Sequence, residues 1–347
     1  MNPPASSTTS ALGAAAEARA WRDSRALVRV APLAVAAILL AVFPWVGGKF
    51  YVDLAAKIMI LAIFALSLEL LVGQTGLVSF GHAAFFGIAA YAAALVTPKS
   101  EAASLWLVAP AAIGAAALYA LAVGALSLRT RGVYFIMITL AFAQMAYFIF
   151  HDTPFGGGSD GIYLYFRPDA AIFGWRPFDL DAGHTFYYAV LACLVGTFGL
   201  LAVMLRSRFG RALAGIRVSE QRMRAAGFDT YAYKLAAFVL AAMLAGLAGL
   251  LHALKDGYVN PELASWHESG AVLLMIILGG IGRLRGAVIG AFAFVLLQEF
   301  FKNDAMFGEF AKRWQLMLGA TIIACVLLLP HGLVGLPQRL RRKGGHG

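Results

Sequence analysis

Glycines and polar residues crowd one short part of an otherwise apolar stretch: Gly73, Gln74, Gly76, Ser79, Gly81 and His82. A plain membrane span avoids such groups, and the chemistry they suit is the passage of a solute. In lipid, backbone made irregular by glycine is tolerated only where protein or a water-filled cavity surrounds it. The stretch therefore predicts a broken or re-entrant helix that lines a path. A helix that uses small residues for close packing explains the same pattern, and both interpretations stay open.

Two ionisable residues accompany this stretch. Glu69 lies about one turn before Gly73 and has no obvious local partner. A carboxylate inside a membrane is a functional candidate by default. We favour the simpler interpretation, in which Glu69 lies near the cytoplasmic boundary and reaches water. For His82, a structural residue that bridges backbone groups freed by the glycines is favoured over a proton relay.

A second glycine-rich break repeats the Gly-x-x-Gly spacing of Gly73–Gly76. Corresponding breaks in two halves of a transporter indicate a transport pathway. Gly286 and Gly290 favour helix packing instead at this second break. The predicted translocation pathway combines Glu69 and the first break with the second, which contains Gly279, Gly280 and Gly282.

The composition indicates a polytopic, all-α membrane protein. Of 347 residues 61% are hydrophobic and 13% are charged, with a mean hydropathy of +0.77. Cys193 and Cys325 both lie in apolar runs, so neither a metal site nor a disulfide framework is expected. The net charge of +10 follows membrane topology, which argues against a nucleic-acid partner. The sequence GGGSDG at 156–161 lacks the Lys-Ser/Thr ending of a phosphate-binding loop, so we expect no ATP hydrolysis and no cofactor bound by this chain.

About ten transmembrane helices are predicted, with broken or re-entrant members: 30–46, 51–72, 76–97, 103–128, 132–151, 186–205, 233–254, 268–283, 286–302 and 313–330. With both termini inside, cytoplasmic segments hold nineteen Lys and Arg residues and outer segments eight. This bias predicts an N-in, C-in bundle. The organisation expected is a disordered cytoplasmic tail 1–26, a membrane domain 27–335 and a basic cytoplasmic tail 336–347.

Two loops carry further patterns. Segment 206–229 places apolar residues at helical spacing among arginines, which predicts an amphipathic helix that lies on anionic lipid or docks into a partner. Docking is favoured, through Arg217, Glu220, Ala225, Ala226 and Gly227. The outer loop 152–185 suits contact with a binding protein or a lid, and packing on the bundle is equally open. Its candidate residues are Gly157, Gly158, Ser159, Asp160 and Gly161.

Several motifs in order resemble one family. They are GQTGLVSFGHAAFFGIAAYAAA, LRTRGVYFIMITLAFAQ, GGSDG, RSRFGRALAGIRVSE, AAGFDTYAYKLAAFVLAAMLAGLAGLLHA and LGGIGRLRGAVIGA. Together they resemble the branched-chain amino acid ABC-importer permeases, of the LivM type, over about residues 50–335. Segment 206–229 also resembles the "EAA" coupling loop of importer permeases, which fits a groove in the ATPase subunit. Where the family more often has asparagine, this chain has Glu69.

The resemblance implies a non-catalytic permease in the bacterial inner membrane. Its partners would be a second, LivH-type permease, two ATP-binding subunits that use the ATP, and a periplasmic substrate-binding protein. The solute would be a branched-chain amino acid or a related small molecule. The alternative is an ion-coupled secondary transporter, for which Glu69 is the one suitable buried acid.

Overall fold

The computed structural model describes residues 35–98, 100–169, 183–329 and 332–335. The chain divides into two units at Val52–Asp53. The described part of the first unit is helix Val35–Val46 and the first turn of α2 (Lys49–Glu69). Both predicted tails, 1–26 and 336–347, lie outside the described residues.

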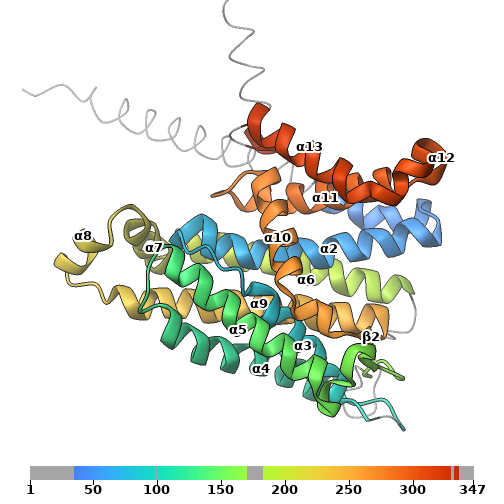
Figure 1. Cartoon of the computed structure of the whole chain (residues 1–347), viewed down its shortest axis with the longest axis horizontal. Helices are drawn as coiled ribbons and strands as arrows, with labels where there is room; N and C mark the ends of the chain where they lie inside the picture. Colours follow the sequence, from blue (N-terminus) through green and yellow to red (C-terminus); the bar gives the residue numbers. More distant parts are fainter. Residues whose placement is uncertain (1–34, 99, 170–182, 330–331, 336–347) are drawn as a thin grey trace, which may run out of the picture. The chain divides into compact units, whose positions relative to one another are not determined.

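The second unit is mostly helical, as predicted (Figure 1). After α2 its elements are η1 (Leu70–Thr75), α3 (His82–Val96), α4 (Leu105–Ser127), α5 (Val133–Asp152), η2 (Pro154–Gly156), η3 (Gly158–Asp160), β1 (Ile162–Tyr163), α6 (Gly183–Arg206), α7 (Arg208–Val218), α8 (Glu220–Ala225), α9 (Thr230–Asp256), β2 (Tyr258–Val259), η4 (Pro261–Ala264), α10 (Trp266–Gly279), α11 (Leu284–Phe301), α12 (Asp304–Phe307), η5 (Gly308–Arg313), α13 (Trp314–Leu328) and η6 (Leu333–Gly335).

Within the described ranges, seven helical segments are long and apolar enough to cross a membrane: Lys49–Thr75, Leu105–Ser127, Val133–Asp152, Gly183–Arg206, Thr230–Asp256, Leu284–Phe301 and Asp304–Gly335. Three shorter apolar helices, Val35–Val46, α3 and α10, complete the set. The polytopic prediction is confirmed, whereas the count of ten spans and their orientation stay predictions. The expected helix 76–97 is wrong at its start, because α3 begins only at His82.

Small residues let α3 lie at the centre of its neighbours. It packs against α9, α4, α5 and η4. A Cβ added to Gly249 of α9 would overlap the carbonyl oxygen of Phe86, and one added to Gly87 would lie 2.7 Å from the Ala264 Cβ. In a membrane, where lipid is as apolar as leucine, close packing of this kind holds helices together.

Helix α9, the longest of these helices, is bounded by residues that favour the two ends of a helix. The Asp229 carboxylate accepts hydrogen bonds from the backbone N–H groups of Tyr231 and Ala232, both at 3.2 Å, and so caps the start of α9. At its other end Gly257 takes a left-handed conformation with φ of 65°. β2 follows directly and pairs antiparallel with β1. These signals fix the two ends of the helix against which α3 packs.

Gly249→Ala is expected to destabilise the folded protein by about 1–3 kcal/mol, because the added methyl group has no room beside Phe86. The midpoint of thermal unfolding in detergent measures this. Gly199→Ala in α6 is the matched control, since a Cβ there meets nothing within 4 Å. Equal midpoints for the two variants would contradict the close approach of α3 and α9.

Candidate functional site

The first glycine-rich break is an interruption between two helices. α2 ends at Glu69 and continues as the π-helical turn η1, in which the Thr75 hydroxyl donates to the Leu71 carbonyl at 2.6 Å. Gly76 follows with φ of 76°, a conformation that favours glycine. The backbone stays non-helical until α3 begins at His82. The predicted break is therefore confirmed, and it spans 70–81.

The second break is a short turn between α10 and α11. Gly280 and Gly282 have φ of 113° and 88°. A Cβ on Gly286 would lie 2.5 Å from the Gly280 carbonyl oxygen, and one on Gly290 would overlap the carbonyl oxygen of Met275. The packing interpretation is confirmed for Gly286 and Gly290. Gly279 shares this role, because its α-carbon lies against the Gly286 backbone.

Glu69 joins the two breaks. Its carboxylate Oε1 accepts a hydrogen bond from the Gly282 N–H at 2.7 Å. The side chain is fully buried, so the expectation that Glu69 reaches water is wrong. The same carboxylate lies over Gly73, where a Cβ would collide with it. Gly73 thus makes room for the acid that bridges to the second break.

Arg217 brings the basic loop 206–229 into the same cluster. From α7 its guanidinium donates a hydrogen bond to the Gly73 carbonyl oxygen. Its Cγ lies 3.5 Å from the position of a Cβ on Gly76. The sequence assigned Arg217 to coupling and Gly73 and Gly76 to the pathway, and the fold places all three side by side. Gln74 is half-buried and Gly76 is exposed, so the cluster lies at the edge of the described protein.

The remaining polar residues of the first break serve the structure. Ser67 donates to the Phe64 carbonyl at 2.6 Å and lies 2.8 Å from His82 Nε2. Because that hydroxyl has one proton, the imidazole N–H is the donor to Ser67 Oγ. His82 is fully buried and structural, as favoured, but its partner is a side chain and not freed backbone. Ser79 accepts from the Gly81 N–H at 3.3 Å, and a Cβ on Gly81 would overlap the Thr139 carbonyl oxygen in α5.

The predicted amphipathic helix 206–229 is two helices. α7 ends at Val218, and Ser219 caps α8 by accepting from the Arg222 N–H at 3.4 Å. Serine competes for backbone hydrogen bonds and favours such starts, which explains the break. α7 buries Leu213 and Ile216, whereas α8 buries none of its residues. The expectation of a single helix is wrong.

Glu220 holds this loop to the membrane helices. Its carboxylate contacts Arg224 at 2.6 Å, Lys234 at 2.9 Å and the Thr230 hydroxyl at 3.1 Å. Burial raises the pKa of Glu220, but the hydrogen bonds and positive charges of these neighbours outweigh burial and lower that pKa. The other residues predicted to dock into the ATPase, Ala225, Ala226 and Gly227, are exposed. Docking into an ATPase stays a prediction. The contacts of Glu220 fix the loop next to the exposed residues 225–227.

The described part of the outer loop is tied to the chain. β1 pairs with β2, and the Tyr258 hydroxyl donates to the Asp160 carbonyl at 2.9 Å. Gly157, Gly158 and Gly161 all have positive φ, which is why this turn contains three glycines. Ser159 and Asp160 are exposed. Residues 160–163 thus contact the segment that follows α9, and the role of the loop stays a prediction. Residues 170–182 of the loop lie outside the described residues.

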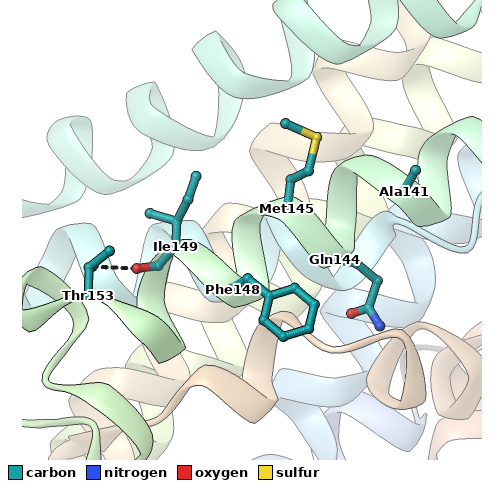
Figure 2. A pocket seen from close by; sticks show the side chains of 6 residues that line it. All are labelled: Ala141, Gln144, Met145, Phe148, Ile149 and Thr153. Carbon is teal, nitrogen blue, oxygen red and sulfur yellow. Dashed lines mark hydrogen bonds between the residues drawn. The ribbon is translucent and has the colours of Figure 1, made fainter.

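One surface feature escaped the sequence patterns. An open groove of about 600 Å³ runs along α5. Figure 2 shows its lining residues Ala141, Gln144, Met145, Phe148, Ile149 and Thr153. Gln144 supplies an amide whose Oε1 is buried without a hydrogen-bond partner among the described residues. A single amide at helical spacing from exposed apolar residues is the signal that could have identified this groove.

A family model described as the permease component of the branched-chain amino acid transport system matches residues 50–327. The chain belongs to this permease family. Its match covers both glycine breaks, α5 and the loop that contains α7 and α8.

Two relatives agree over most of their length. The high-affinity branched-chain amino acid permease LivM of Escherichia coli K12 is 30% identical over 90% of this chain and 76% of its own. LivM of Salmonella typhimurium is 29% identical over 89% of this chain and 76% of its own length. The xylose transport permease XylH of Escherichia coli K12 is 27% identical over 34% of this chain and 30% of its own. No solved structure matches the chain.

Acidification is expected to loosen the coupling loop, because Glu220 has a lowered pKa in the folded protein. Its stabilising charge is present above the ordinary carboxyl pKa and is lost as pH falls through the lowered value. The anisotropy of a dye on Gln221→Cys, with Cys193 and Cys325 replaced by serine, should fall over that pH range. In Glu220→Gln the anisotropy should start low and stay flat. A pH dependence that survives in Glu220→Gln would contradict this role.

Proposed function

We propose that this chain forms one half of the membrane pathway of an ABC importer for branched-chain amino acids or related small solutes. The second half is a LivH-type permease, and two ATPase subunits and a periplasmic binding protein complete the inner-membrane complex. The observation that carries this proposal is the match to the permease family over residues 50–327. Both full-length relatives carry the LivM name. ATP hydrolysis resides in the partner subunits.

The arrangement of the second unit supports this reading. Both breaks meet beside α7, a helix that carries three arginines. Basic loops favour the cytoplasm, so we place α7, α8 and the meeting point of the breaks on the inner side, with both termini inside. The exposed residues 225–227 would then face the ATPase. The glycine breaks would form the inner end of the pathway.

We assign the α5 groove to the pathway wall opposite the second permease. The Gln144 side chain lines the groove, and an amide group is costly against lipid, which offers no hydrogen bond. The other lining residues are mostly apolar, and an apolar groove with a single amide suits a small aliphatic solute. The second permease would close this open groove into a channel.

Isolation of tagged chain from detergent-solubilised native membranes is expected to recover a second permease and two ATPase subunits. In proteoliposomes with its binding protein, this complex should import labelled leucine, isoleucine or valine only with ATP inside. An uncoupler should leave uptake unchanged. Recovery of the chain alone, together with uptake that collapses on uncoupling, would instead establish an ion-coupled transporter.

Gln144→Leu is expected to lower the maximal uptake rate about tenfold and leave KM nearly unchanged, because the external binding protein sets capture of the solute. Gln144→Asn should lose less, since it keeps the amide. Leu327→Asn on α13, an exposed site outside the groove, is the control for adding an amide to the membrane surface. Equal uptake by Gln144→Leu and the unmodified complex would remove α5 from the pathway wall.

A further inference from the structure

A chain of polar contacts links α7 to both glycine breaks. Arg217 donates to the Gly73 carbonyl in η1, and Glu69, at the start of η1, accepts from the Gly282 N–H. The N–H of the next residue, Arg283, also faces the Glu69 carboxylate. Residues separated by 144 and 213 positions are thus joined through two side chains.

The two side chains also attract each other. Glu69 is fully buried, and the positive charge of Arg217 acts on its carboxylate. The Gly282 N–H satisfies the Oε1 atom of Glu69, whereas Oε2 is buried with no hydrogen-bond partner among the described residues. The two side chains therefore connect three segments that are distant in sequence: the first break, the second break and α7.

The segments it joins have irregular backbone. Gly76 and Gly282 both adopt positive φ, and neither break contains regular α-helical hydrogen bonding across it. A Cβ on Gly282 would lie 3.6 Å from the Arg217 guanidinium and 4.0 Å from the Gly73 carbonyl oxygen. α7 packs directly on η1. A displacement of α7 thus reaches both breaks through contacts that already exist.

We infer that Glu69 and Arg217 are positioning residues that tie both breaks to α7, so that movement of the coupling loop by the ATPase moves the inner end of the pathway. The inference rests on the proposed importer function. It assigns Glu69 to transmission between helices rather than to contact with the solute. Removing either residue should separate ATP hydrolysis from transport and leave the complex assembled.

The first test uses the whole complex in proteoliposomes and measures uptake and ATP hydrolysis together. Arg217→Ala and Glu69→Ala should each lower uptake about tenfold while hydrolysis stays within about twofold. The double variant should be no worse than either single variant, because both break one link. Arg217→Lys should recover part of the uptake. Glu69→Gln should lose less than Glu69→Ala, since its amide oxygen still accepts from Gly282.

The matched control is Arg211→Ala, which removes one exposed arginine from the same helix. It should retain both uptake and hydrolysis. The inference is wrong if uptake and hydrolysis fall in parallel, since the residues would then serve ATPase docking or assembly. It is equally wrong if Glu69→Gln and Arg217→Ala transport normally, or if the losses in the double variant multiply.

A second measurement tests the link without transport. Spin labels on Val218→Cys in α7 and Ile281→Cys in the second break, both exposed sites, report their separation in the purified complex. The unmodified link should give one narrow distance distribution with and without ATP, and Arg217→Ala should broaden it. An unchanged distribution would overturn the inference even if ATP-driven uptake is established. A complex that shows the link but no ATP-driven uptake would overturn the proposed function alone.

Discussion

The buried carboxylate of Glu69 is the group around which the two glycine-rich breaks of this permease are arranged. It ends α2, lies over Gly73 and accepts the backbone N–H of Gly282. Position 73 requires glycine, because a Cβ at that position would collide with the Glu69 carboxylate. The turn after α10 directs the Gly282 N–H at Oε1 of this carboxyl group, because a buried polar group needs a hydrogen-bond partner.

Close packing of small residues imposes the second constraint. α3 is enclosed by α4, α5, α9 and η4, and its backbone approaches Gly249 in α9 and Thr139 in α5. Such proximity lets irregular backbone at 76–81 exist within an apolar chain, since protein surrounds it on several sides. His82 and Ser67 complete this environment with a buried hydrogen bond.

The loop that contains α7 and α8 is anchored to α9 through Glu220, whereas its tip is exposed. Glu220 binds Lys234, Thr230 and Arg224, so the end of α7–α8 is anchored to the start of α9. Residues 225–227 remain exposed beyond that anchor. In the proposed importer, an anchored loop with an exposed tip would let a partner subunit move the helices to which the loop is fixed.

The sequence by itself determined the mostly helical membrane architecture, the positions of both glycine breaks and the helical character of the basic loop. These features depend on local composition, on helical periodicity and on glycine's freedom at positive φ, all of which are written in short windows of sequence. The family was also recognisable from motif order. The division of the loop at Ser219 was missed because local capping outweighs apolar periodicity. The start of α3 was missed because the backbone before His82 is non-helical although its residues are mostly apolar or small.

Only the tertiary structure decided what the polar residues contact. Glu69 was expected to reach water, yet it binds a residue 213 positions away, and Arg217 reaches back 144 positions to Gly73. The α5 groove likewise depends on which helices leave that face uncovered. Such partners are set by how helices pack against one another, and the periodicity of a single helix shows which face is buried but not which neighbour covers it.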